Sequence, residues 1–261
     1  MSKSIKSVFI TGAATGIGRA TALRFAGEGY FVGLYDVNLL GVTSLAKELG
    51  SSRAVSGLLD VTDYRAFEAA LKSFVKAAGG RLDVLVNNAG ILSCGAFEAL
   101  PAERQHALID VNAKGVSNGC LAAYPYLKIT RGARVINMAS ASAIYGAPGF
   151  AVYSATKFFV RGLTEALNVE WGGQGIAVSD VMPLFVDTPM VANLNERPKS
   201  IARLGIQLNA QDIAAVIWQA ANDRKPRVHY YPGAQAKALV AMQRWVPERL
   251  NRLSTKLLTG Y

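Results

Sequence analysis

Short apolar runs alternate with longer amphipathic stretches along most of the chain. The short runs are typical of buried strands, and the stretches between them repeat apolar residues at helical spacing. The pattern predicts strands at Ser7–Thr11, Phe31–Tyr35, Ala54–Leu59, Leu82–Val86, Val135–Met138, Ile176–Met182 and Val228–Tyr231. It predicts helices at Arg19–Glu28, Leu39–Leu49, Tyr64–Ala78, Pro101–Leu127, Phe150–Trp171, Ala210–Asn222 and Gln235–Leu258.

This alternation predicts the fold class. Strands separated by helices form right-handed crossovers and a parallel sheet with helices on both faces. We therefore expect an α/β protein, a doubly wound Rossmann-like sheet, with residues 1–261 in one domain. The pattern loosens at 184–209, where irregular chain with one or two short helices is expected. Pro125 should disturb the end of its helix, and Pro247 should break the last one.

Charge is distributed unevenly. The formal net charge is +10, and residues 197–261 hold 11 Lys/Arg against 3 Asp/Glu, whereas residues 1–196 hold 17 against 15. A basic tail can attract nucleic acid, an anionic membrane or an anionic cofactor. No aromatic and basic recognition module is visible, so no nucleic-acid partner is expected.

The sequence of the basic amphipathic stretch 237–258 does not decide which surface its apolar residues contact. Its apolar residues are Leu239, Val240, Trp245, Leu250, Leu253, Leu257 and Leu258. Packing of this set on the body of the domain or on another subunit is the favoured interpretation, and peripheral contact with a membrane is the alternative.

The sequence lacks the patterns of a membrane-spanning helix, a signal peptide and a cysteine metal site. No run approaches the length of a membrane-spanning helix, and the apolar run near the start is too short for a signal peptide. Cys94 and Cys120 have no metal-type spacing. We expect a cytoplasmic protein without a bound metal.

A glycine-rich turn joins the first strand to the first helix. Gly12, Gly16 and Gly18 lie in this turn, with Ile17 between the last two. Such glycines let the backbone approach a pyrophosphate, and the helix N-terminus supplies free N–H groups. Asp36 ends the second strand, eighteen residues after Gly18. That position suits an acidic residue that binds the adenosine ribose of a dinucleotide.

Tyr153 and Lys157 lie four residues apart in a predicted helix, and therefore on one face. The pKa of a free tyrosine is about 10, so as a base near neutral pH it lacks about 4 kcal/mol. A cation about 4 Å away, at an effective dielectric of about 20, stabilises the phenolate by about that amount. The spacing is therefore compatible with an acid–base tyrosine, although it is also common on solvated helix faces.

Taken together, these motifs resemble the short-chain dehydrogenase/reductase superfamily over about residues 5–190. The resemblance rests on the glycine turn, Asp60 after the third strand, Asn87-Asn88-Ala89-Gly90, Asn112, Ser140, and Tyr153-x-x-x-Lys157 with thirteen residues from Ser140 to Tyr153.

This resemblance implies the catalytic roles. Tyr153 would be the acid–base residue, and Lys157 would lower its pKa and bind the nicotinamide ribose. Ser140, preferred over Ser142 on spacing, would bind the substrate oxygen. Asn112 would help hold a water for proton relay, or else bind only local backbone as a core residue.

The same resemblance implies the cofactor contacts. Asp60 and Val61 would contact adenine, Asn88, Ala89 and Gly90 would flank the adenosine side, and Thr188 would bind the carboxamide. Asn88 has an alternative role, which is to stabilise the central sheet.

The preferred cofactor and substrate follow from a few positions. Asp36 would repel the 2′-phosphate of NADP, and no Lys or Arg stands at Thr15 or directly after Asp36, so NAD is favoured over NADP. Arg19 is near in sequence but lies inside the helix. Leu184 replaces the family's usual glycine after Pro183.

We expect an NAD(H)-dependent oxidoreductase that interconverts a secondary alcohol and a ketone. Its substrate is expected to be largely apolar, next to Leu92, Cys94, Ile144, Phe150 and Phe185, with 184–209 as a mobile flap. The resemblance also implies a homo-oligomer, a dimer or a tetramer. An NADP-dependent carbonyl reductase and a non-catalytic dinucleotide-binding regulator are the alternatives.

Overall fold

A parallel sheet forms the centre of the protein. The structure is a computed structural model that describes residues 5–194 and 198–259. Within these ranges seven strands form this sheet, in the order β3-β2-β1-β4-β5-β6-β9, and all neighbours are parallel. The strands are β1 (Ser7–Thr11), β2 (Phe31–Asp36), β3 (Ala54–Leu58), β4 (Val84–Asn87), β5 (Arg134–Met138), β6 (Ala177–Val181) and β9 (His229–Tyr230). The predicted fold class is confirmed.

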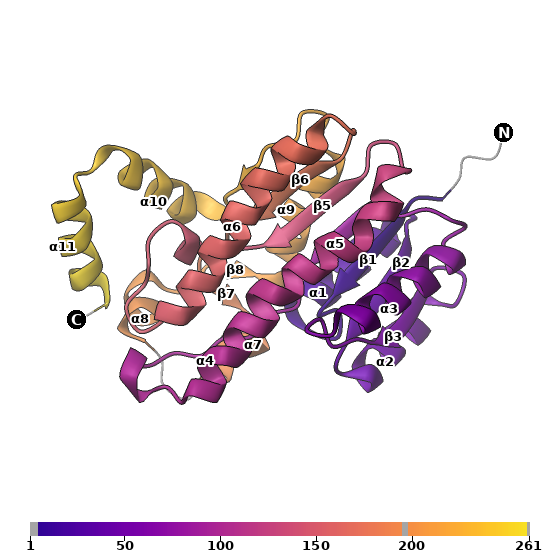
Figure 1. The fold of residues 1–261 in the computed structure, drawn as a ribbon. Coiled ribbons are helices and arrows are strands. Elements are labelled where there is room, and N and C mark those ends of the chain that lie inside the picture. Colours follow the sequence, from indigo (N-terminus) through magenta and orange to yellow (C-terminus); the bar gives the residue numbers. More distant parts are fainter. Residues whose placement is uncertain (1–4, 195–197, 260–261) are drawn as a thin grey trace.

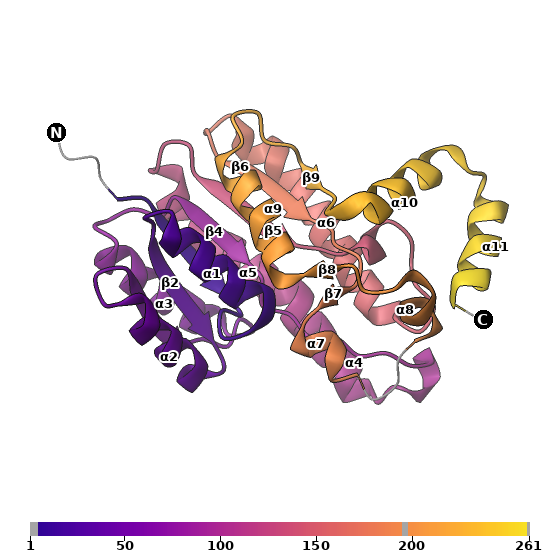
Figure 2. The same cartoon turned by 180° about the vertical axis from the view of Figure 1, so that it is seen from behind.

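Helices cover both faces of this sheet (Figures 1 and 2). One face carries α1 (Gly16–Gly27), α2 (Leu39–Leu49) and α9 (Ala210–Asn222), packed on an apolar core that includes Phe25 and Ile213. The other face carries α3 (Tyr64–Ala77), α5 (Gly115–Lys128) and α6 (Ala151–Gly172), around a core that includes Phe67 and Leu127. The central strands β1 and β4 have no exposed residues, which explains the uninterrupted apolar runs Val8–Ile10 and Val84–Val86 within them.

The strand order reverses at β1. The chain runs from β1 outward to β2 and β3, and then returns to place β4 on the other side of β1. The turns after β1 and β4 therefore leave in opposite directions, and a crevice opens at the carboxyl ends of these strands. Ligands of open α/β sheets bind at such reversal points.

The predicted helix 101–127 consists of three segments. These are α4 (Ala102–Ile109), a π-helical turn η2 (Asp110–Lys114) and α5. The π turn inserts an extra residue at Asn112 and shifts the direction of its side chain relative to the flanking turns. Pro125 lies inside the last turn of α5, which continues three residues further to Lys128 and ends one residue after the predicted Leu127.

The region after β6 is mostly irregular, as predicted, with short elements. These are β7 (Val186–Asp187), α7 (Pro189–Ala192), α8 (Lys199–Leu204) and β8 (Leu208–Asn209), besides the 3-10 turns η1 (Phe97–Ala99) and η3 (Ala141–Ala143) earlier in the chain. The sequence did not predict that β7 and β8 pair with each other in a parallel two-stranded sheet. Residues 195–197 of the predicted flap lie outside the described residues.

The last two helices form an arm that extends from the body of the molecule (Figures 1 and 2). They are α10 (Gly233–Trp245) and α11 (Glu248–Thr259), separated near Pro247 as predicted. Trp245, Leu250, Leu253 and Leu257 are exposed. These four residues are therefore not packed on the body of the domain, and the expected packing on another subunit stays a prediction. No described helix combines the length and apolar character that a membrane crossing needs.

Candidate active site

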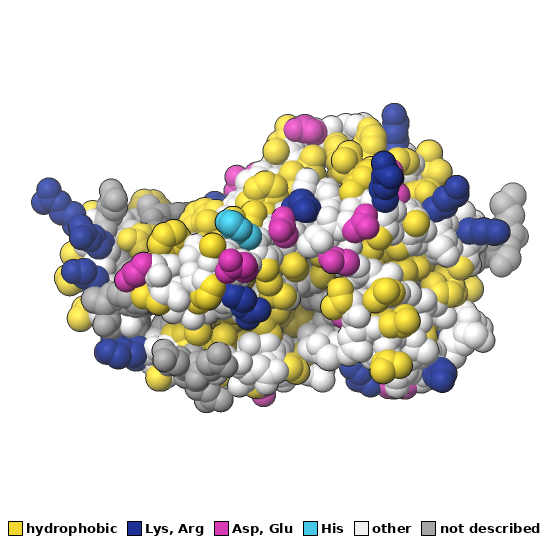
Figure 3. All heavy atoms as spheres, turned by 60° about the horizontal axis from the view of Figure 1, so that its bottom comes forward, with side chains coloured by type: hydrophobic (Ala, Val, Ile, Leu, Met, Phe, Trp, Pro, Cys, Tyr) yellow, Lys and Arg dark blue, Asp and Glu magenta, His cyan; other side chains and the backbone are white. Residues whose placement is uncertain are grey.

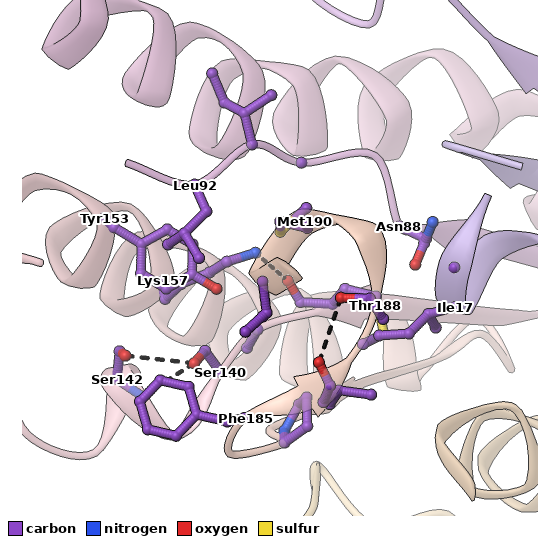
Figure 4. A pocket seen from close by; sticks show the side chains of 18 of the residues that line it. Ile17, Asn88, Leu92, Ser140, Ser142, Tyr153, Lys157, Phe185, Thr188 and Met190 are labelled. Carbon is purple, nitrogen blue, oxygen red and sulfur yellow. Dashed lines mark hydrogen bonds between the residues drawn. The ribbon is translucent and has the colours of Figure 1, made fainter. Parts of the chain in front are cut away.

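A cavity of about 450 Å³ lies at the carboxyl ends of the sheet strands. Segments far apart in the sequence line it, from the glycine turn after β1 to the end of α11 (Figure 4). The predicted site residues that line it are Gly12, Gly16, Ile17, Asp36, Asp60, Val61, Asn88, Ala89, Gly90, Ser140, Tyr153, Lys157 and Thr188. Gly18 and Asn112 are not among the described lining residues.

The glycine turn has no room for side chains. Gly12 has a φ of 66°, and a Cβ there would lie 2.8 Å from the Cα of Ala89. At Gly18 a Cβ would lie 2.0 Å from the carbonyl oxygen of Gly12. The glycines thus hold the turn against the end of β4 and keep the cavity floor free of side chains. Gly18 acts through this packing and not as a cavity wall.

The N-terminus of α1 opens into this cavity. Thr15 precedes the helix and makes no side-chain capping hydrogen bond, and the first turn carries no acidic residue. The leading N–H groups of the helix, next to cavity-lining Gly16 and Ile17, therefore meet no side-chain acceptor or carboxylate of their own turn. These free donors, with the positive end of the helix dipole, fit the pyrophosphate of a dinucleotide.

Asp36 occupies the position expected for a ribose ligand. Its carboxylate accepts hydrogen bonds from the N–H of Ala14 at 3.0 Å and the N–H of Asn38 at 2.9 Å. These bonds fix the carboxylate at the cavity wall. Arg19 points elsewhere and forms an ion pair with Glu48 at 2.7 Å. Among the described residues, no Lys or Arg forms an ion pair with Asp36.

Asn88 joins the end of β4 to the glycine turn. Its side-chain amide donates to the carbonyl oxygens of Thr11 at 2.9 Å and Gly12 at 3.0 Å. The N–H groups of Asn88 and Ala89 both donate to the hydroxyl of Thr11 at 3.0 Å. The structural role expected as an alternative is therefore present, although Asn88 also lines the cavity. Asp60 holds its own turn, because it accepts from the N–H of Thr62 at 2.9 Å.

Thr188 brings the region after β6 to the glycine turn. A Cβ on Gly16 would lie 3.5 Å from the methyl carbon of Thr188. The hydroxyl of Thr188 donates to the carbonyl oxygen of Val186 at 3.3 Å (Figure 4). The predicted flap therefore begins directly above the predicted cofactor site.

Tyr153 lies in the first turn of α6 with Ser140 beside it (Figure 4). Burial raises the pKa of Tyr153 to about 12, and a hydrogen bond with Ser140 opposes this rise. The hydroxyl oxygens of Ser140 and Ser142 are 3.4 Å apart, and the Ser140 oxygen accepts the N–H of Ser142 at 3.2 Å. The bond to Tyr153 supports the choice of Ser140 over Ser142.

Lys157 lies one turn further along α6 and is buried. Its Nζ donates to the carbonyl oxygen of Met138 at 2.7 Å and lies 5.5 Å from the centre of the Tyr153 ring. Burial lowers the pKa of Lys157 to about 8. Because burial is the largest influence on both groups, the lowering of the Tyr153 pKa by Lys157 stays a prediction.

The side chain of Asn112 is fully buried and bonds to the backbone. Its Oδ1 accepts from the N–H of Ile91 at 2.8 Å, and its Nδ2 donates to the carbonyl oxygen of Ile91 at 2.9 Å. This pairing holds the chain after Gly90 against the π turn and agrees with the alternative interpretation of Asn112. Its part in a proton relay stays a prediction.

The cavity continues past Tyr153 along an apolar wall that includes Leu92, Phe150, Leu184 and Phe185, as expected. Cys94 and Ile144, which were expected there too, are not among its described lining residues. The sequence analysis missed lining residues Tyr145, Met190, Ser200, Leu204, Leu239, Thr255 and Thr259. No local motif marks them, since they come from separate segments that only the tertiary fold brings together.

Comparisons with known proteins agree with this architecture. A family model described as short chain dehydrogenase matches residues 6–199. The 3-oxoacyl-(acyl-carrier-protein) reductase FabG of Thermotoga maritima is 37% identical over 229 residues, which cover 85% of this chain and 93% of the relative. Meso-2,3-butanediol dehydrogenase of Serratia marcescens is 33% identical over 222 residues, covering 84% of this chain and 88% of the relative.

A solved structure is similar as well. The 3-ketoacyl-(acyl-carrier-protein) reductase from Brucella melitensis, crystallised as a complex with NADH, superposes with a TM-score of 0.79 at 28% identity. The match covers 87% of this chain and 96% of that chain.

Proposed function

The chain belongs to the short-chain dehydrogenase/reductase superfamily, and on that premise we propose that it transfers a hydride between NAD(H) and the carbon of a secondary alcohol or ketone. The observation that carries this proposal is the joint position of Tyr153, Ser140 and Lys157 on the wall of the cavity whose floor is the glycine turn. The bound nicotinamide supplies hydride acceptor and donor chemistry, which no side chain provides.

The protein's own residues handle the oxygen and its proton. Tyr153 donates its hydroxyl proton to the substrate oxygen in reduction and removes that proton in oxidation. Ser140 donates a hydrogen bond to the same oxygen and stabilises the negative charge that develops on it. The apolar wall excludes water and so strengthens both interactions.

Lys157 has two proposed tasks. Its charge stabilises the Tyr153 phenolate, and its Nζ binds the nicotinamide ribose. Asn112 is proposed to support the proton relay indirectly, because its side chain already pairs with Ile91 and shapes the π turn.

We propose NAD as the cofactor on the strength of Asp36. Its carboxylate accepts two backbone N–H groups at the cavity wall, and Arg19 pairs with Glu48. A ribose diol can donate hydrogen bonds to this carboxylate, whereas a 2′-phosphate meets its negative charge. Gly12, Gly16, Ile17 and Gly18 form the pyrophosphate cradle. Asp60, Val61, Asn88, Ala89 and Gly90 surround the adenosine, and Thr188 binds the carboxamide.

The proposed substrate is largely apolar around its carbonyl. Leu92, Phe150, Leu184 and Phe185 form the wall next to Tyr153, and these side chains cannot satisfy a charged group. Residues 184–209 are the proposed flap, because Leu184, Phe185, Thr188, Met190 and Leu204 all line the cavity. We further propose a homo-oligomer in the cytoplasm, where a reducing environment suits Cys94 and Cys120, which are not joined in a disulfide.

One set of assays tests the proposal. Secondary alcohols and ketones are screened with NAD(H) and NADP(H) by nicotinamide absorbance, in the native chain and in Tyr153→Phe. Removal of the acid–base group should lower kcat by about 10²- to 10⁴-fold. Cofactor affinity, measured by fluorescence titration, should change little, because the phenyl ring stays. Unchanged turnover in Tyr153→Phe rejects the mechanism, and preference for small charged substrates rejects the apolar pocket.

A further inference from the structure

The outermost helix, α11, exposes a stripe of leucines that an ordinary surface helix would bury. Asn251 is buried, Ser254 is half-buried, and Thr255 and Thr259 line the cavity, so these four polar residues lie on the inward side. The leucines Leu250, Leu253 and Leu257 point outward and are 55%, 52% and 65% exposed. A surface helix normally buries its apolar stripe against the protein.

This stripe is continuous with basic residues. At helical spacing the three leucines share one side of α11, and the exposed cations Arg249, Arg252 and Lys256 form the adjacent stripe. Trp245, at the end of α10, is 86% exposed. Figure 3 shows basic side chains projecting from the end of the molecule that the arm forms, with hydrophobic side chains beside them.

The arm as a whole is strongly cationic. Its sequence from 233 to 259 carries five Lys/Arg (Lys237, Arg244, Arg249, Arg252 and Lys256) against one acidic residue, Glu248, a net charge of +4. The neighbouring helix α8, which contacts α11, adds exposed Lys199 and Arg203. Leucine and tryptophan next to a row of cations are the features of a helix that lies in the interface of an anionic bilayer.

We propose that the outward face of the α10–α11 arm, defined by Trp245, Leu250, Leu253 and Leu257 with Arg249, Arg252 and Lys256, docks on an anionic lipid surface. Charge favours this partner over a second copy of the chain. A twofold contact would place the same patch, and hence the same cations, against each other. Anionic headgroups neutralise those cations while the apolar side chains enter the acyl boundary.

Vesicle co-sedimentation with the full chain tests the docking without any catalysis. The chain should sediment with vesicles of phosphatidylcholine and phosphatidylserine, should not sediment with phosphatidylcholine alone, and should be released by salt. Leu253→Ser with Leu257→Ser should weaken binding by about tenfold or more. Arg249→Gln, Arg252→Gln and Lys256→Gln together should weaken it by about 100-fold, at about fivefold for each cation.

Matched variants provide the controls. Ile5→Ser with Ile129→Ser removes two other exposed apolar side chains, and Lys72→Gln with Lys76→Gln removes two exposed cations of α3. Both should bind vesicles as the native chain does. Binding that the arm variants leave intact, or the absence of binding to phosphatidylserine, overturns the proposal. Sedimentation velocity provides a further test. If Leu253→Ser with Leu257→Ser changes the oligomeric state, the native leucine stripe is covered by a second copy of the chain, and the proposal is overturned.

Docking has a consequence for the substrate, and this step rests on the proposed function. Leu239, Thr255 and Thr259 line the cavity from the inner side of the arm, so a docked arm brings that end of the cavity to the lipid surface. A water-insoluble ketone dissolved in anionic vesicles should therefore show a lower KM than the same ketone in detergent, with kcat unchanged. The leucine variant should lose this difference. An equal KM in both media rejects the lipid route while the co-sedimentation result stands.

Discussion

Substitution of Asp36 by Asn tests the origin of cofactor choice with little change in shape. The carboxylate accepts the N–H groups of Ala14 and Asn38, and an amide oxygen can keep one of these two bonds. The fold of the turn should therefore persist while one negative charge leaves the cavity wall. Asp60→Asn is the matched control, because Asp60 also lines the cavity and also accepts a local backbone N–H.

The expected magnitude follows from the charge. A 2′-phosphate carries about −1.5 to −2 charges, and each unit placed about 4 Å from a carboxylate costs about 4 kcal/mol at an effective dielectric of about 20. Asp36 is partly exposed, so water and salt reduce this repulsion to about 2–3 kcal/mol. Its removal should therefore strengthen NADP binding by about 30- to 150-fold. NAD binding should weaken by about fivefold, because a charge-assisted hydrogen bond to the ribose becomes a neutral one.

The assay is a pair of fluorescence titrations, with NADH and with NADPH, of the native chain and the two variants. Asp36→Asn should reverse or abolish a preference for NADH, and Asp60→Asn should change both dissociation constants by similar factors. A native chain that already binds NADPH more tightly refutes the reasoning. An equal shift of the NADH-to-NADPH ratio in both variants refutes it as well, because the effect then comes from general charge and not from the ribose position.

Three further substitutions address the fold around the site. Gly18→Ala should abolish cofactor binding in fluorescence titration, because its Cβ would lie 2.0 Å from the Gly12 carbonyl oxygen. Gly27→Ala is the control and should leave cofactor binding unchanged, because a Cβ there would have nothing within 4 Å. Equal cofactor binding by the two variants contradicts the role of the turn. Lys157→Met should abolish turnover. It should also raise the free energy of unfolding at pH 7 by about 2 kcal/mol in urea titrations, since burial has lowered the lysine pKa from 10.5 to about 8 and the lost hydrogen bond to Met138 offsets about 1 kcal/mol of that gain. In the native chain this lysine makes stability rise between about pH 8 and 10.5, where the unfolded state holds more protons, and a variant that keeps this rise contradicts the assignment. His229→Leu should destabilise the fold by about 3–5 kcal/mol in the same titrations, because buried Asp180 loses the imidazole 3.0 Å away. Asp180→Asn in the His229→Leu background should restore most of the lost stability. If it does not, the loss comes from packing alone.

The turn after β1 shows how much local sequence can predict. Gly12, Gly16 and Gly18 stand between an apolar run and an amphipathic run, and both the positive φ of Gly12 and the close packing of Gly18 follow from that context. Asp36 was equally predictable, because it ends a buried strand next to β1. These features depend on neighbours in sequence or on adjacent strands, which the alternation of strands and helices already orders.

Other features depend on contacts that no local pattern encodes. The π turn at Asn112 breaks a helical stretch whose composition gives no sign of it, and it is held by bonds to Ile91, twenty-one residues away. Thr255 and Thr259 look like solvated positions of an amphipathic helix, yet they face the cavity. The leucines of α11 differ from these threonines in the opposite way, because their apolar periodicity predicts a buried face and yet they are exposed. Apolar periodicity does not identify the surface that would cover such a face.

Tyr153 and Lys157 show that the right residues and spacing do not by themselves produce the right pKa values. Lys157 lies 5.5 Å from the Tyr153 ring centre, and at an effective dielectric of about 20 its charge stabilises a phenolate by about 3 kcal/mol, or about two pKa units. Starting from about 12, this brings the tyrosine only to about 10, so a base active near neutral pH needs further help. The hydrogen bond from Ser140 is already included in that starting value and adds nothing further. The oxidised nicotinamide ring is cationic, so its proposed place beside Tyr153 provides the remaining stabilisation only when the cofactor is bound. The acid–base group is therefore expected to become a competent base in the complex and to stay a neutral phenol in the free enzyme.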